Sequence, residues 1–203
     1  MSRPGAPLFD SAALRALLGE VDRELDDGEP IRIVACGGAV MLLKYDIRRT
    51  NDVDVISEPF PGELRSAAQT VGERHGLRDE WINDAAKISI PRLTPRFETL
   101  YSGRRLSVLS PGPHFILAMK LAACRDVDFD DAVRLIQEIG YRDVDQVLDL
   151  IDQAWGHTNI SMSVEYFSRG VFEEATGGLR TPTAELSEPP PRTAGRPSLD
   201  FFD

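Results

Sequence analysis

Residues that mark a disulfide-stapled, zinc-binding or membrane-spanning chain are scarce in this sequence of 203 residues. It contains two cysteines, Cys36 and Cys124, and three histidines without ligand spacing. The cysteines make no disulfide framework and are expected as buried free thiols in a reducing cytoplasm, and the scattered histidines argue against a zinc site. No segment approaches the roughly 18 to 20 apolar residues of a membrane span, and the N-terminus lacks the apolar core of a secretory signal. The sequence therefore predicts a cytoplasmic protein with no membrane partner.

Basic residues are also fewer than acidic residues. The chain has 33 acidic residues against 23 Lys and Arg, a formal net charge of -10. Overall acidity weakens non-specific binding to nucleic-acid phosphates and favours a cationic small molecule or a basic protein through long-range steering. Some of the positive charge occurs in arginine pairs or near-pairs between residues 48 and 105: Arg48, Arg49, Arg92, Arg96, Arg104 and Arg105. These arginines suit either a local basic patch or a solvated surface.

Hydrophobic patterning predicts an α+β fold, in which a mixed β-sheet core precedes a C-terminal helical region. With 42% hydrophobic residues, the chain can bury one core. We expect strands at 31–36, 52–56, 87–91, 97–101 and 105–109. We expect helices at 10–25, 39–44, 61–75, 111–124, 128–139, 144–155 and 164–175. The predicted organisation is an α/β core at 1–110, a helical region packed on it at 111–177, and a disordered Pro-rich tail at 178–203.

The most informative stretch is 31–56, where Gly37 and Gly38 end one apolar run and Asp52 and Asp54 start the next. Alternate residues of a strand point to one face, so the two carboxylates are expected side by side. A divalent cation relieves the repulsion of such a pair. The glycines leave the backbone open beside a helix N-terminus, which favours a phosphate. Each feature alone also suits a plain turn or strand start, but together they indicate phosphoryl or nucleotidyl transfer.

This order of elements resembles the hG[GS]…Dh[DE]h signature of the polymerase-β-like nucleotidyltransferase superfamily. The matching residues are Cys36-Gly37-Gly38 and Asp52-Val53-Asp54-Val55. The preceding turn, at 47–52, is similar to the R-x-T-x-D-h-D form of small bacterial stand-alone members, including toxin-type and AbiEii-like nucleotidyltransferases. The resemblance implies Mg²⁺ (or Mn²⁺) on Asp52 and Asp54. It further implies a nucleotide triphosphate held near Gly37, Gly38, Arg48 and Thr50.

A second arrangement follows in the predicted helix near residue 120. An isolated lysine on an apolar helix usually snorkels to the surface, and acids in a first turn act as caps, which we expect for Asp126 and Asp130. The pattern L-A-x-K-L-x-A…R-D-x-D-x-x-D is nevertheless similar to the second half-site of the same small nucleotidyltransferases. The resemblance implies that Lys120 contacts the triphosphate, and that Asp128 or Asp131 supports the lysine or the metal.

Two further features have open roles. In larger relatives a third metal carboxylate lies on a later strand, and Glu98 is the one acid inside a later predicted strand here, in a context that does not match. The run Trp81-Ile82-Asn83-Asp84 is similar to a short motif of one branch of the family. Trp81 is expected as a core or rim aromatic. Asn83 and Asp84 are expected to cap the turn that follows or to form hydrogen bonds near the site.

The leading expectation is a metal-dependent enzyme that moves an NMP from an NTP to an acceptor hydroxyl. By resemblance to toxin-type members, the acceptor is tRNA or a protein such as a cognate antitoxin, with an aminoglycoside-like small molecule as another option. The alternative is a catalytically weak nucleotidyltransferase fold that acts as a binding module in a toxin–antitoxin or defence pair. A third interpretation is a generic α+β domain in which the aspartate pair is structural.

Overall fold

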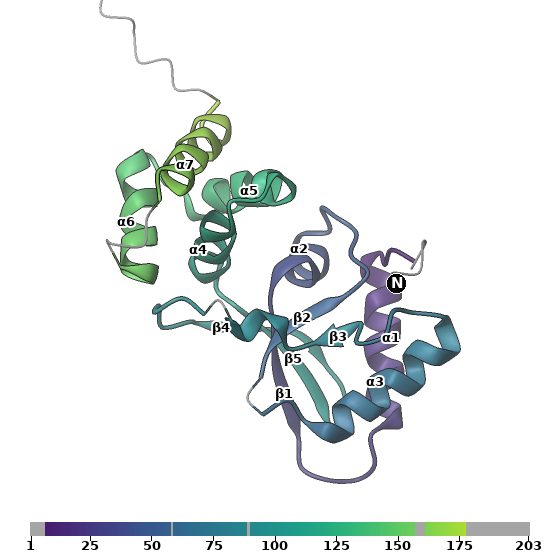
Figure 1. The fold of residues 1–203 in the computed structure, drawn as a ribbon. Helices are drawn as coiled ribbons and strands as arrows, with labels where there is room; N and C mark the ends of the chain where they lie inside the picture. Colours follow the sequence, from purple (N-terminus) through teal and green to yellow (C-terminus); the bar gives the residue numbers. More distant parts are fainter. Residues whose placement is uncertain (1–6, 58, 89, 157–160, 178–203) are drawn as a thin grey trace, which may run out of the picture.

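The computed structural model describes residues 7–57, 59–88, 90–156 and 161–177 and contains a five-stranded mixed sheet (Figure 1). The strands are β1 (Ile31–Ala35), β2 (Val53–Ile56), β3 (Ile82–Asn83), β4 (Phe97–Ser102) and β5 (Leu106–Pro111), in the order β3-β2-β1-β5-β4. Strand β1 pairs in parallel with β5 and antiparallel with β2, while β2 pairs in parallel with β3. The predicted α+β class with a mixed sheet is confirmed.

The first three helices lie beside the sheet, and the last four are grouped together on another side of it (Figure 1). They are α1 (Ser11–Glu24), α2 (Gly37–Tyr45), α3 (Gly62–His75), α4 (Pro113–Ala123), α5 (Phe129–Ile139), α6 (Val144–Trp155) and α7 (Met162–Ala175). Of two 3₁₀ turns, η1 (Ala85–Ile88) follows β3, and η2 (Asp126–Asp128) joins α4 to α5. Helix α1 packs on α3, and α4 packs on α5, α6 and α7. None of the helices in the described ranges is long and apolar enough to cross a membrane.

Local sequence signals explain where the N-terminal helices begin and end. The Asp10 carboxylate accepts a hydrogen bond of 2.8 Å from the Ala13 amide and so caps α1. Helix α3 ends at Gly76, which adopts the left-handed conformation (φ 61°) that glycine permits. On the inner face of α1, the side chains of Leu14 and Leu18 are completely buried. Burial of this stripe fixes α1 against the sheet.

Asp22 ties α1 to the turn that leads into β5. Its carboxylate accepts backbone hydrogen bonds from Arg104 (2.6 Å), Arg105 (2.8 Å) and Leu106 (2.6 Å). Burial alone would raise the pKa of Asp22, but these three N–H groups outweigh burial and lower the pKa. The three bonds hold the start of β5, which is the parallel neighbour of β1. The strand that leads into the Gly-Gly pair is therefore supported from α1.

Three expectations fare differently in the structure. The strand predicted at 87–91 is wrong: the chain turns into η1 directly after β3, and Ile90 is exposed. The two cysteines are free, as predicted, but only Cys36 is buried, while Cys124 is half-buried. The tail predicted as disordered, 178–203, lies outside the described residues.

Candidate active site

At the bend from β1 into α2, the backbone of two glycines lies close to side chains of the segment that leads into β2 and of β2 itself. Gly37 has φ 61°, and a Cβ added to it would lie 3.3 Å from Asp54 Oδ2. A Cβ on Gly38 would lie 3.1 Å from Thr50 Oγ1. Cys36, the N-cap of α2, forms no side-chain cap bond, so this side chain does not occupy the first N–H groups of the helix. The positive φ favours glycine at position 37, and a side chain at position 38 would displace Thr50, while a polar helix end stays open beside Asp54.

Asp52 and Asp54 lie on the same side of β2, as the sequence predicted. The alternate residues Val53 and Val55 are completely buried, while both aspartates are half-buried. Burial raises the pKa of Asp54, and the negative charge of Asp52 raises it further. A hydrogen bond from Asn83 and the charge of Arg125 oppose these effects without cancelling them. The two carboxylates are thus close enough to repel each other.

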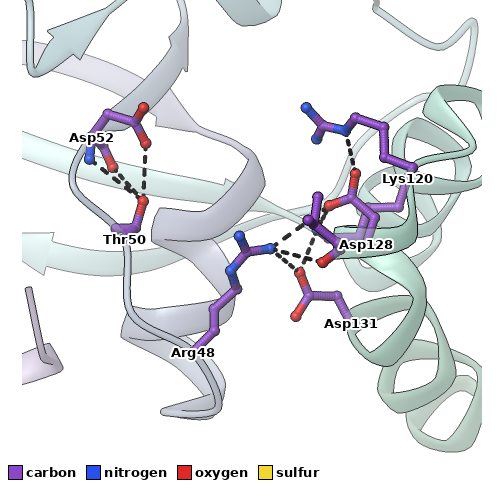
Figure 2. Close-up of polar contacts among 8 residues, drawn as sticks. Arg48, Thr50, Asp52, Lys120, Asp128 and Asp131 are labelled. Carbon is purple, nitrogen blue, oxygen red and sulfur yellow. Dashed lines mark hydrogen bonds and ion pairs between the residues drawn. The ribbon is translucent and has the colours of Figure 1, made fainter. Parts of the chain in front are cut away.

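Asp52 is oriented by two neighbours on its outer side. The Thr50 hydroxyl donates to Asp52 Oδ1 at 2.9 Å, as Figure 2 shows, and Arg78 Nη1 lies 3.2 Å from Asp52 Oδ2. The resemblance to nucleotidyltransferases implies that Thr50 lies near the phosphates of the nucleotide. In the structure its hydroxyl holds the carboxylate, and Arg78 partly neutralises it.

Asn83 stands next to Asp54 on the neighbouring strand. In the parallel pairing of β2 and β3, Asp54 is opposite Asn83. Asn83 Oδ1 accepts a 2.9 Å hydrogen bond from the Ala85 amide, and the same side chain hydrogen-bonds Asp54. The two roles considered for this residue, cap and site contact, therefore both apply. Glu98 instead lies on β4, at the opposite edge of the sheet, where it pairs with Lys44 at 2.9 Å.

A charged cluster with a buried centre joins α4, α5 and the turn before β2. We use this name for Arg48, Lys120, Arg125, Asp128 and Asp131. Lys120 Nζ donates to Asp128 Oδ1 at 2.8 Å and to Asp131 Oδ2 at 2.7 Å. Arg48 Nη1 reaches the same Asp131 oxygen at 2.7 Å (Figure 2), and Arg125 Nε donates to Asp128 at 2.6 Å. Three cations against two carboxylates leave one positive charge.

The neighbours of Asp128 favour its ionised form. Lys120, Asp128 and Asp131 are at most 3% exposed. Burial alone would raise the pKa of Asp128, but hydrogen bonds and charges from Lys120 and Arg125 outweigh burial and lower it. The sequence left the choice between Asp128 and Asp131 open, and the structure places both on Lys120. The expectation that Asp126 and Asp130 act as caps is wrong: they lie in the first turns of η2 and α5, whose N-caps are Arg125 and Asp128, and neither start has a side-chain cap bond.

A cavity of about 340 Å³ lies between β2, η1 and α4, and we call it the central cavity. Gly37 and Asp54 line one wall, Lys120 and Arg125 line another, and Trp155 contributes an aromatic wall. This volume is in the range of small-molecule sites. Three predicted residues, Gly37, Asp54 and Lys120, therefore meet in one cavity. The other predicted residues do not line it: Gly38, Arg48, Thr50, Asp52, Asp128 and Asp131.

The donor chemistry of the aspartate pair fits Mg²⁺ or Mn²⁺, which prefer oxygen ligands. Asp52 and Asp54 repel each other, and a divalent cation would remove that repulsion. Within the described ranges, however, no group of three His, Cys, Asp or Glu side chains is placed to hold a metal. The pair therefore fits a cation that takes its remaining ligands from substrate phosphates and water.

Three residues around the cavity were missed or left undecided by sequence reasoning. Arg125 stands inside the R-D-x-D pattern that pointed to the acids, so its signal was present but unused. Asn83 belongs to a run that was noted but not placed. Trp155 carries no local signal, because only the packing of α6 on α4 brings it to the cavity.

A mixed sheet with a Gly-Gly bend facing an Asp-x-Asp strand defines the nucleotidyltransferase class. The chain belongs to the family described as nucleotidyltransferase of unknown function (DUF6036), whose model matches residues 12–167. That range includes the whole sheet, the charged cluster and the central cavity. Comparison with curated proteins and with solved structures finds no significant match. The family supports putting the chain in the transferase class and points to no particular branch of it.

Proposed function

We propose that this protein transfers an NMP from an NTP to an acceptor hydroxyl with the help of Mg²⁺ or Mn²⁺. The observation that carries the proposal is the close approach of Gly37 to Asp54, where a Cβ added to the glycine would lie 3.3 Å from Asp54 Oδ2. This approach puts a phosphate-binding helix end and a metal-binding carboxylate within reach of one ligand. In this proposal Asp52 and Asp54 hold the metal.

The phosphates are held by backbone and by positive charge. The first N–H groups of α2, at Gly37 and Gly38, would bind the β- and γ-phosphates through hydrogen bonds and the helix dipole. Arg125, whose side chain is 63% exposed and lines the cavity, adds a charge-assisted contact. Lys120 and Arg48 contribute the excess positive charge of the charged cluster, and Asp128 and Asp131 keep Lys120 in position.

The reaction needs mainly positioning and charge neutralisation. The bound cation would neutralise the charge that develops on the α-phosphate and on the leaving pyrophosphate. Asp54, which lines the central cavity, would also accept the proton of the acceptor hydroxyl. The new bond joins the acceptor oxygen to the α-phosphorus, and the bond between the α-phosphorus and the bridging oxygen breaks.

We further propose tRNA or a protein hydroxyl as the acceptor, as in the toxin-type members that the turn at 47–52 resembles. A protein acceptor would then be a cognate antitoxin, and the reaction would take place in the cytoplasm. The net charge of -10 supports a basic protein more than bulk RNA, because the overall field attracts cations. A cationic small molecule is the next choice for the same reason.

Transfer of label is the direct test. The protein is incubated with each α-labelled NTP, Mg²⁺ and either total tRNA or the product of the neighbouring gene. We expect one acceptor to become labelled, and the rate to fall by about 100-fold or more in Asp52→Asn and Asp54→Asn. Asp130→Asn is the matched control, because Asp130 is exposed in the first turn of α5. Transfer that survives in Asp54→Asn would contradict the proposal.

A second candidate function is a binding module with little or no catalysis. It is favoured by the absence, within the described ranges, of a third metal-binding acid beside the aspartate pair. In that case no acceptor is labelled with any NTP, while a partner co-purifies with the wild type and with Asp54→Asn alike. The labelling experiment therefore separates the two functions.

A further inference from the structure

The central cavity is lined by two chemically different sets of residues. Gly37, Asp54, Lys120 and Arg125 together offer backbone N–H groups and formal charges. The second set consists of uncharged side chains of η1, α4 and α6. These are Ala85, Ala86, Met119, Ala122, Ala123 and Trp155. We call the part of the cavity that this second set lines the apolar end.

From this division we infer that the apolar end of the central cavity binds the nucleobase of the NTP. The inference rests on the proposed function, because it places the remainder of the same ligand. A nucleotide has a polyanionic end and a planar, weakly polar end, and the cavity presents partners for both. Indole rings and thioethers are favourable partners for a base, through stacking and through sulfur–aromatic contact.

The alanines determine the shape of this end. Ala85 and Ala123 are exposed at its rim and Ala122 is half-buried, so short side chains line the opening. A larger side chain at any of these positions would extend into the space that a ring needs. The cavity volume of about 340 Å³ also suits a nucleoside-sized group better than a macromolecule.

The side chains of the apolar end have few hydrogen-bonding groups that could recognise the polar edge of the base. Its side chains carry one N–H donor, Trp155 Nε1, and that group already donates to the Ala118 carbonyl at 3.3 Å. The amide of Ala85 is likewise occupied by Asn83. If the base is recognised by its stacking area, purine nucleotides should bind more tightly than pyrimidine nucleotides. The affinities for adenine and guanine nucleotides should differ by less than about tenfold.

Two probes separate the base from the phosphates. The first is Mg²⁺ with a non-hydrolysable ATP analogue, and the second is Mg²⁺ with inorganic tripolyphosphate, which has no base. Both affinities are measured by calorimetry on the full chain. We expect Ala122→Leu to weaken the analogue by about tenfold or more and to leave tripolyphosphate unchanged. The control Ala16→Leu, at an exposed position of α1, changes neither affinity.

Intrinsic fluorescence gives an independent signal. The chain has two tryptophans, and Trp81 is 1% exposed with its Nε1 bound to the Ala68 carbonyl. We expect the ATP analogue to change the emission of the wild type but not that of Trp155→Phe. Tripolyphosphate should leave both emissions unchanged. Should Ala122→Leu fail to fold, Ala123→Leu at the exposed rim replaces it.

The results distinguish the inference from the proposed function. Equal weakening of both probes by Ala122→Leu, or no weakening of either, would overturn the nucleobase assignment. An emission change that persists in Trp155→Phe would overturn it as well. If instead Asp54→Asn leaves the affinity for Mg²⁺ and tripolyphosphate unchanged, the proposed function fails, whatever the apolar end binds.

Discussion

Lys120 and Asp131 form an almost completely buried ion pair, with 2.7 Å between Nζ and Oδ2. The pair joins α4 to α5, and Arg48 extends it to the turn before β2. Removing the lysine leaves two buried carboxylates with less compensation, because Asp128 also depends on it.

We therefore expect Lys120→Met to lower the free energy of unfolding by about 3 kcal/mol. Urea denaturation measures the change. In the double variant with Asp131→Asn, the second change removes the unpaired charge. The loss in free energy of unfolding should therefore be smaller than the sum of the two single losses, by about 1 kcal/mol or more. A stability of Lys120→Met within error of the wild type would show that the pair contributes nothing.

The glycine bend gives a prediction with a matched control. Gly37→Ala and Gly140→Ala both put a Cβ on a backbone with positive φ, at 61° and 79°. Each is expected to cost about 1 kcal/mol of stability. Gly140 has open space around it, whereas a Cβ on Gly37 would face Asp54 Oδ2. Only Gly37→Ala should therefore slow nucleotidyl transfer, by about tenfold or more. Equal rates in the two variants would contradict this role for the bend.

Asn83 should control how strongly the aspartate pair binds a metal. We expect Asn83→Ala to weaken Mn²⁺ binding by about tenfold, because Asp54 loses the hydrogen bond that favours its charged form. Asn83→Asp should strengthen binding by adding a carboxylate opposite Asp54, and should lower the stability of the metal-free protein through repulsion. Electron paramagnetic resonance of free Mn²⁺ gives both affinities. Unchanged affinity in both variants would exclude Asn83 from the metal site.

The three backbone bonds to Asp22 predict an acid-sensitive contribution to stability. The pKa of Asp22 is lowered in the folded state, so its contribution is fully present above the usual value of 3.8 and is lost as the pH falls through the lowered pKa. Asp22→Asn should cost about 1–3 kcal/mol at neutral pH. Urea denaturation at several pH values should show the difference from the wild type shrinking in acid. A difference that is independent of pH would disprove this linkage.

Much of the fold follows from local patterns. The β-branched run of β1, the Gly-Gly pair and the alternation around Asp54 are contiguous in the chain, so the order of elements at the site could be read directly. The same holds for the caps at Asp10 and Gly76. Family membership was within reach for the same reason, because the signature lies in one short stretch.

Other parts depend on contacts between distant segments. Strand β3 has two residues, too few for a period of two to be visible, whereas the more regular alternation at 87–91 predicts a strand that does not form. The pairing of Lys120 with both acids is also non-local. Asp128 and Asp131 are three residues apart, so they share one helix face at the start of α5 and can both reach it.

The central position of β1 has a consequence for synthesis on the ribosome. Strand β1 lies between β2 and β5, so a nascent chain that ends before Leu106 carries the Asp-x-Asp strand but leaves one edge of β1 unpaired. Lys120 and its two acids emerge later still. A growing polypeptide can therefore assemble the candidate site only after Lys120 and its two acids have been made.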